Sequence, residues 1–307
     1  MDSANKQTAI IGEVVQGTTP ATPPFKLLRD SRVSGSPQRP ASRSPERRAD
    51  RMAANMTNGL FTFPKSIEMP WVRDNGLDVL WESALCGAWA ADVLKNASTK
   101  MPFTLEEKYE GGTTDPYRRL IGCLVDQVSV GFRNGDPGSL SFGIKALDEL
   151  QATAAIAGAT YAAPTPGYDP STPADIVVGD LFGITAPKVM GLNMTISNSL
   201  RDQHAWGSNS PFGLGLGQFD VSGSVQFYFT LAAEYSTFVT RQTGRTLSLT
   251  IGATTNFKDT IELGNVDVFN PDIDDPGATG DHMVTLNFMA RYYATSTSAI
   301  TLTRLAA

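Results

Sequence analysis

The amino-acid sequence predicts a mainly β protein, with two tandem β-α-β-β-β repeats behind an extended N-terminal arm. The 28 glycines and 19 prolines among 307 residues, with many serines and threonines, are typical of short strands joined by turns. Several segments alternate apolar and polar residues, as a half-buried strand does. The same order of such segments occurs twice along the chain, which indicates an internal duplication.

Composition limits the class of protein. With 41% apolar and 18% charged residues, the chain can bury a core and is not a disordered protein. It contains no apolar run of about 18 residues, so we expect no membrane-spanning helix, and its first residues lack the pattern of a secretory signal. Cys86 and Cys123 lie in apolar surroundings and are expected to be buried free thiols of a protein made in a reducing compartment.

Residues 1–55 are predicted to form the extended arm, which is basic and rich in proline. The arm carries nine Lys and Arg against five acids, whereas the whole chain has a net charge of −6. Its prolines exclude a helix and restrict strand pairing to sheet edges. We expect the arm to cross a neighbouring subunit, where Arg29, Arg47, Arg48 and Arg51 would pair with acids. A nucleic-acid tail is the alternative, although an acidic body does not suit phosphate binding.

The two repeats are assigned to residues 56–145 and 188–307, with an Ala-, Gly- and Pro-rich linker at 146–187. Each repeat opens with an alternating strand, continues through an amphipathic helix and a short strand, and ends with two further strands. In the longer of these last two strands the alternation slips at the same place in both copies. The slip predicts a β-bulge after Val125 in the first repeat and after Leu263 in the second.

The polar face of the predicted strands is small, hydroxylic and acidic, with Lys145 and Arg291 only at its far ends. A solvated face ordinarily mixes both charges. A face without cations suits a wall past which a polyanion slides, because a basic wall would hold the polyanion. The residues predicted to face such a lumen are Thr62, Ser66, Glu68, Ser129, Ser139, Ser141, Asp220, Ser222, Ser224, Gln226, Glu262, Asp267, Thr285 and Asn287.

No pattern of residues indicates catalysis, so we predict no enzyme activity, no cofactor and no metal site. The two histidines, His204 and His282, lie near no cysteine and show no metal-binding spacing. The glycines at 213–217 lack the strand-to-helix context of a dinucleotide loop. The acidic stretch at 272–277 has Met283 where a calcium loop needs its glutamate, and is interpreted as a hairpin loop.

Several stretches resemble the tail tube (major tail) protein of long-tailed bacteriophages. They are Pro-Phe-Lys-Leu-Leu-Arg at 24–29, Ser-Pro-Glu-Arg-Arg-Ala-Asp-Arg at 44–51, the helix at 77–87, Phe-Thr-Leu-Glu-Glu-Lys-Tyr at 103–109 and Gly-Cys-Leu-Val at 122–125. The resemblance runs from about residue 24 to residue 293. It implies a structural protein with the fold of the type VI secretion tube protein, a small β-barrel or sandwich with a flanking helix.

The resemblance also implies a place in the virion. The protein would assemble in the host cytoplasm into rings that stack into the tail tube, the conduit for DNA ejection, without binding DNA specifically. Its partners would be further copies of itself and the tape measure, tail terminator and distal tail proteins, with no membrane anchor. We expect the loop acids Asp272, Asp274, Asp275 and Asp281 at ring-to-ring contacts, with Asp115 in the corresponding loop of the first repeat.

The number of chains in a ring is predicted from strand spacing. Strands about 4.8 Å apart and tilted by about 40° add about 2 Å each to a barrel's diameter. If each repeat lends four strands, six repeats give about 24 strands and about 48 Å, which passes a duplex about 20 Å wide. Two repeats per chain then predict a trimeric ring with pseudo-sixfold symmetry. If one repeat lies outside the wall, the ring has six chains instead.

Two other classes of function are alternatives. A virion decoration or receptor-binding β-protein would share this composition but would expose an aromatic-rich patch and would not need to close a ring. A glycosidase-type enzyme would need two carboxylates in one cleft, and no pattern in the sequence places such a pair.

Overall fold

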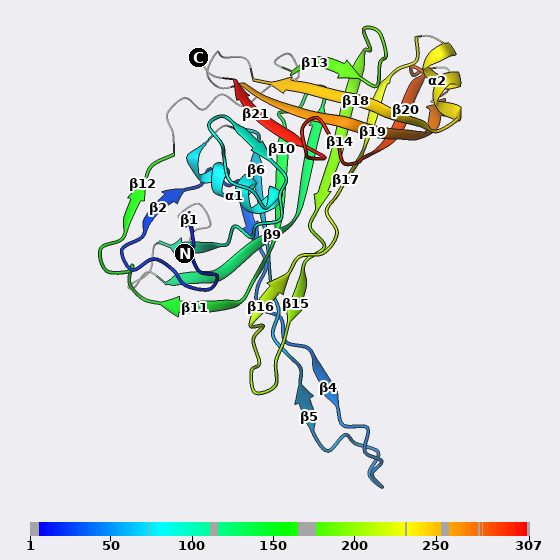
Figure 1. Ribbon diagram of the computed structural model, residues 1–307. Coiled ribbons are helices and arrows are strands. Elements are labelled where there is room, and N and C mark those ends of the chain that lie inside the picture. Colours follow the sequence, from blue (N-terminus) through cyan, green and yellow to red (C-terminus); the bar gives the residue numbers. More distant parts are fainter. Residues whose placement is uncertain are drawn as a thin grey trace.

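The computed structural model shows a mainly β protein in which one sheet of 17 strands contains most of the strands (Figure 1). Its two helices, in the part of the chain that is described, are α1 (Asn75–Leu85) and α2 (Ala232–Val239). Neither is long and apolar enough to cross a membrane. The structure describes residues 6–72, 74–110, 116–164, 176–230, 232–252, 258–275, 277 and 279–305, without the side chains of Ala233, Glu234 and Leu305.

Eight antiparallel strands form the central sheet, in the spatial order β3-β6-β10-β9-β14-β17-β20-β19. Because side chains alternate across a strand, one face of this sheet is apolar and the other is polar. The strands are β3 (Arg32–Ser34), β6 (Phe63–Pro70), β10 (Ser139–Ala146), β9 (Tyr117–Arg133), β14 (Val189–Ser197), β17 (Asp220–Tyr228), β20 (Met283–Ala290) and β19 (Lys258–Asp274).

Each half of the central sheet uses its elements in the same order. In the N-terminal half, β6 is followed by α1, β7 (Val93–Lys95), β8 (Phe103–Tyr109), β9 and β10. In the C-terminal half, β17 is followed by α2, β18 (Gln242–Ile251), β19 and β20. In both halves the first strand pairs with the last, the last with the long strand, and the long strand with the strand that precedes it, β8 or β18. The N-terminal half has the additional strand β7 between its helix and β8, and β7 pairs with β21 (Thr301–Leu305). Common descent of the two halves stays a prediction.

Both long strands change register at the predicted β-bulges. Pairing of β9 with β10 shifts between Val125 and Gln127, and pairing of β19 with β18 shifts between Leu263 and Val266. Before the bulge each strand has other partners: β9 pairs with β8 and β11 (Asp148–Ala152), and β19 pairs with β18 and β21. Each bulge therefore bends the long strand, so that one part of the strand belongs to the central sheet and the other part to the strands behind it.

The predicted barrel is not closed within one chain. Over the residues that the structure describes, the central sheet ends at β3 on one side and at the C-terminal part of β19 on the other. A closed barrel would pair these two edges. They are the first and last of the eight strands, and within the described residues they do not pair with each other.

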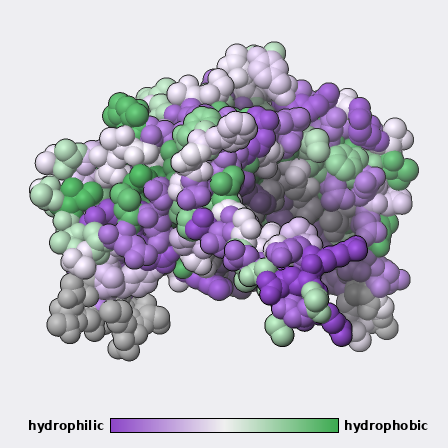
Figure 2. Space-filling model, turned by 90° about the horizontal axis from the view of Figure 1, so that it is seen from below, coloured by the Kyte–Doolittle hydropathy of each residue, from purple (hydrophilic) through white to green (hydrophobic). Residues whose placement is uncertain are grey.

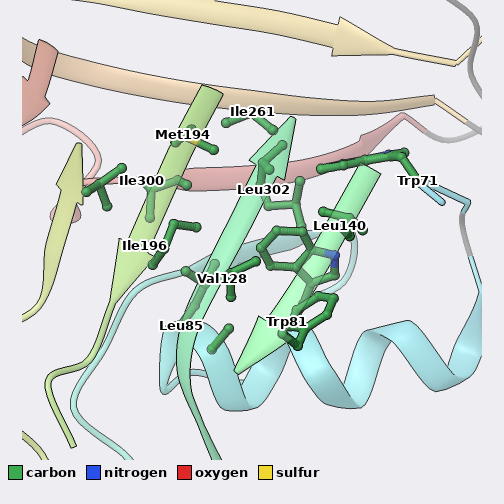
Figure 3. Packing of buried hydrophobic residues seen from close by; sticks show 14 of the residues in the cluster. Trp71, Trp81, Leu85, Val128, Leu140, Met194, Ile196, Ile261, Ile300 and Leu302 are labelled. Atoms are coloured by element: carbon green, nitrogen blue, oxygen red, sulfur yellow. The ribbon is translucent and has the colours of Figure 1, made fainter. Parts of the chain in front are cut away.

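The apolar face of the central sheet packs on both helices and on the strands behind it. The ring of Trp81 in α1 meets Phe142 of β10 edge-on, with centroids 5.5 Å apart. Figure 3 shows Trp81 and Leu85 beside Val128 and Leu140 of the sheet. In the C-terminal half, the outer strands β18, β13 (Ile176–Leu181) and β21 complete the same core. Burying one such side chain contributes about 1.5–3 kcal/mol.

The N-terminal segment is divided, where the sequence predicted a single arm over residues 1–55. β1 (Lys6–Gly12) pairs with β8 along its whole length and with β2 (Pro24–Leu27), which pairs with β12 (Thr160–Ala162). The backbone groups of these strands are thus satisfied within the chain. Only residues 39–61, the basic hairpin, project freely, with β4 (Ala41–Arg43) and β5 (Met56–Asn58) as its two strands (Figure 1).

A second hairpin lies beside the basic hairpin. It contains β15 (Arg201–Gln203) and β16 (Gly213–Gly215), and it leaves the sheet between β14 and β17, as the basic hairpin does between β3 and β6. The amide of Phe61 donates a hydrogen bond of 2.9 Å to the carbonyl of Asn209, which joins the two hairpins.

A buried ionic cluster anchors β1 behind the N-terminal half. The carboxylate of Glu107 in β8 is fully buried and lies 2.7 Å from Lys6 Nζ and 2.6 Å from Lys65 Nζ. Burial alone would raise the pKa of Glu107, but hydrogen bonds from both lysines hold that pKa below its ordinary value. Burial also lowers the pKa of Lys65. Breaking a buried pair of this kind leaves an uncompensated charge, at a cost of about 3–5 kcal/mol.

Candidate functional surfaces

The strand registers connect polar residues into rows that cross the central sheet. One row runs through Glu68, Ser141, Ser129, Thr195 and Ser222, from β6 to β17 without a break. Directly opposed residues point to the same side of a sheet, so these rows make one surface, the polar face. The polar face crosses the junction between β9 and β14 and therefore belongs to both halves.

The polar face is hollowed. A cavity of about 1070 Å³ opens on it, and Glu68, Ser129, Ser139, Ser141 and Thr195 are among its lining residues. Hydroxyl groups line much of the cavity, together with the carboxylates of Asp30 and Glu68. Arg29 is the one cation among its described lining residues and pairs with Asp74 of its own chain, so the cavity offers a polyanion little positive charge.

Twelve of the residues predicted to face a lumen lie on this polar face, partly or fully exposed. They are Thr62, Ser66, Glu68, Ser129, Ser139, Ser141, Asp220, Ser222, Ser224, Gln226, Thr285 and Asn287. Their assignment to a lumen remains a prediction, since one chain shows a face and not a channel.

The other two predicted lumen residues belong to β19: Glu262 lies on a different layer, and Asp267 lies on the polar face by register but is mostly buried. Glu262 precedes the bulge, where β19 pairs with β18 and β21, so it is exposed on a different layer. Asp267 is only 8% exposed, because Arg291 lies 2.7 Å from its carboxylate. Strand alternation alone could not identify either case, because it shows neither which layer a bent strand joins nor which side chain from a distant residue covers a position.

Sequence reasoning also missed part of the polar face. Asn193, Thr195 and Ser197 of β14 lie on it, with Gln127 of β9 opposite Ser197. A signal was present, because Leu192, Met194 and Ile196 alternate with these polar residues. The strand was overlooked because it follows the linker, ahead of the segment taken as the opening of the second repeat.

Opposite charges gather at opposite ends of the central sheet. The acidic turn, residues 272–282, starts in the last residues of β19 and leads to β20, beside Tyr228 at the C-terminal end of β17. It carries Asp272, Asp274, Asp275 and Asp281, all exposed. The basic hairpin leaves the sheet near the other end of β17, with five arginines and two acids in its sequence. Figure 2 shows that this end of the molecule is largely hydrophilic.

The arginines predicted to act between subunits differ in their surroundings. Arg47 and Arg51 are exposed on the basic hairpin, and Arg48 forms a 3.1 Å ion pair with Asp50 nearby. Arg29 lies outside the hairpin, 3.6 Å from Asp74 of its own chain. The first-repeat acid Asp115 lies outside the described residues.

The two thiols and the possible metal ligands of the described residues show no reactive site. Cys86 and Cys123 are free and buried, as predicted, and burial raises the pKa of Cys86 to about 11. Over the described ranges, no three His, Cys, Asp or Glu side chains are placed so that they could hold a metal ion.

Comparison with known proteins identifies the family of the chain. The family model described as phage tail tube protein matches residues 3–290, nearly the whole chain. No curated protein matches the sequence. A match of this length shows the family, so the chain belongs to the phage tail tube proteins, structural components of the virion tail that are not enzymes.

Proposed function

We propose that three copies of this chain close into a ring, that the rings stack into the tail tube, and that the polar face lines the channel for DNA. The observation that carries the proposal is the continuity of the polar face over eight strands from both halves. Most polar side chains of this face are hydroxyl, amide or carboxylate groups, which release no counterions on contact and so let a polyanion pass.

The stoichiometry is supported by the number of strands that each chain lends to the central sheet. With eight strands per chain, three chains give about 24 strands and a backbone diameter of about 48 Å. Six such chains would give about 96 Å, far wider than a duplex about 20 Å across requires. Both halves lie in one sheet, which favours the ring of three over the ring of six in which one half stays outside.

Stacking is supported by the separation of charge. When rings stack in one direction, the basic hairpin of one ring faces the acidic turn of the next, and exposed Arg47 and Arg51 can meet Asp274 and Asp275. Such contacts are screened by salt over about 10 Å at 0.1 M ionic strength. Raised salt should therefore separate rings before it opens them, and rings that open first would contradict this part of the proposal.

Negative-stain microscopy of the purified protein tests the function directly. We expect rings or rods with a visible channel. Single particles would contradict the proposal and favour a receptor-binding protein, for which the fully exposed Trp206 and the 65%-exposed Phe212 of the second hairpin would be suited.

A variant of the polar face tests the role of the channel. Ser222→Lys with Asn287→Lys should assemble normally but reduce DNA delivery in infection, since added cations would hold DNA. Ser222→Asp with Asn287→Asp is the matched control, and we expect it to deliver DNA. Equal delivery by both variants would show that this face does not line the channel.

A further inference from the structure

The outer edge of the N-terminal half resembles β14 in its pairing. Arg32 lies opposite Glu68 and Gln38 opposite Thr62, so residues 32–38 follow β6 in one register, with paired residues at 32–34 and at 38. Gly191 lies opposite Gln226 and Ser197 opposite Asp220, so residues 191–197 run along β17 in the same manner. Each segment is the strand that precedes a projecting hairpin.

The two segments differ on their other side. Residues 191–197 pair antiparallel with residues 127–133 of β9, and this junction joins the two halves of the central sheet. Residues 32–38 have no strand there in the described chain, although their exposed backbone groups could pair with one.

The opposite side of the central sheet has a matching open edge. In β9, the residues after the bulge pair with β10 on one side and with β14 on the other. In β19, the residues that follow the bulge form pairs with β20 on one side. On the other side, only Val266 and Val268 form pairs with β18. For residues 269–274 the structure describes no partner strand on that side.

We propose that residues 34–38 of one chain pair antiparallel with residues 270–274 of the next chain in the ring, as β14 pairs with β9 inside the chain. The inference deepens the proposed function, because it names the strands that would close the ring. The occupant of each open edge is a second copy of the chain, since the two edges correspond to the two sides of the internal junction.

The internal junction also sets the register. A row that starts at Arg32 crosses the N-terminal half through Glu68, Ser141 and Ser129 and reaches Thr195. Thr195 lies four positions beyond Gly191, the residue equivalent to Arg32. Each half therefore advances the register by about four residues for four strands, which corresponds to a strand tilt of about 35°, as closed barrels have.

The same advance can be applied to the C-terminal half. A row that starts at Gly191 passes through Gln226 and Thr285 and reaches Asp272. If the register again advances by four residues, Asp272 lies opposite Ser36 of the next chain. Arg32 then lies beside the acidic turn of that chain, so the charges of the two edges are complementary.

Each edge carries a residue that discourages pairing with other strands. Pro37 and Pro271 donate no hydrogen bond, and Asn270 has a left-handed backbone with φ of 51° at the bulge in β19. Prolines and bulges are common protections of open edges against random association. The edges would therefore pair only where a partner of the right shape is presented.

Cysteine cross-linking of assembled full-length protein tests the junction. The variant S36C/D272C would be treated with a short bismaleimide, which tolerates a small register error; the native Cys86 and Cys123 are buried and should not react. We expect a ladder of covalent products that ends at three chains. Single variants S36C and D272C should give no ladder, and their mixture should give dimers only.

Two further variants make the result decisive. S129C/T195C bridges the internal junction and should cross-link within one chain, which checks the chemistry. S36C/V177C tests the other exposed edge strand, β13, where Val177 is 60% exposed. Electron microscopy of the same samples shows whether rings have formed, independently of the cross-linked products. Rings without an S36C/D272C product, or with an S36C/V177C product, would overturn the proposed junction and leave tube formation standing.

Discussion

The two halves of the central sheet present the same kind of polar face but are supported differently from behind. The N-terminal half rests on α1, a helix of 11 residues whose N-cap Asp74 accepts a hydrogen bond from Gly76 N, and on the layer that contains β1, β2, β8 and β11. The C-terminal half rests on α2, a helix of only 8 residues, with β13 and β18 beside it. The comparison suggests that the face is the shared requirement, while the N-terminal half provides most of the rigidity.

The strongest test of this comparison is truncation of one aromatic residue in each half. Trp81→Ala should lower the free energy of unfolding by about 3–5 kcal/mol, because Trp81 packs between Trp71 and Phe142. Phe238→Ala in α2 should cost less, about 2–3 kcal/mol, since a shorter helix at the edge can relax into the space. Urea unfolding of the unassembled protein measures both, and an equal or larger loss for Phe238→Ala would refute the difference in rigidity.

The buried ionic cluster allows a second test within the N-terminal half. Glu107→Gln leaves Lys6 and Lys65 without their carboxylate and should cost about 3 kcal/mol at pH 7. Glu110→Gln is the matched control, because Glu110 also pairs with a lysine, Lys108 at 2.7 Å, but at the surface; it should cost about 0–1 kcal/mol.

The same pair of variants predicts a pH dependence. The folded protein holds the pKa of Glu107 below its ordinary value, so this group's contribution is present above about pH 4.5 and is lost as the pH falls through the folded-state pKa. Stability of Glu107→Gln should therefore approach that of the parent protein in acid. A gap that stays constant down to pH 3 would mean that packing, and not charge, accounts for the effect.

The smallest expected effect concerns Asp30, close to the open edge of the N-terminal half. Burial raises its pKa, so the folded state holds a proton more readily than the unfolded state. Its contribution to stability is present at low pH and declines as the pH rises through the raised pKa. Asp30→Asn should therefore be more stable than the parent at pH 7 and equal to it below pH 3.8. Thermal melts at both pH values measure this, and destabilisation at pH 7 would contradict it.

Much of this architecture could be predicted from sequence, for identifiable physical reasons. The bulges in β9 and β19 were predicted because a slip in alternation must change the face of every later side chain. Two helices, one in each repeat, were predicted from their apolar spacing, and α1 and α2 lie there. The face composition was predictable because it depends only on which residues alternate with the core.

Other features could not be predicted, because they depend on contacts between distant segments. Nothing local in residues 6–12 indicates that they pair with β8, about a hundred positions later in the chain. The burial of Asp267 depends on Arg291, which reaches it from beyond the end of β20. Closure of the barrel is absent from the single chain because its two edges belong, on our proposal, to different copies.

The most direct test of the central claim is a cryo-electron microscopy reconstruction of the assembled protein. We expect three chains in each ring, with the N-terminal and C-terminal halves alternating around the channel and Ser129, Thr195 and Ser222 facing the lumen. A ring of six chains in which only one half reaches the lumen, or a lumen lined by any surface other than the polar face, would contradict the account.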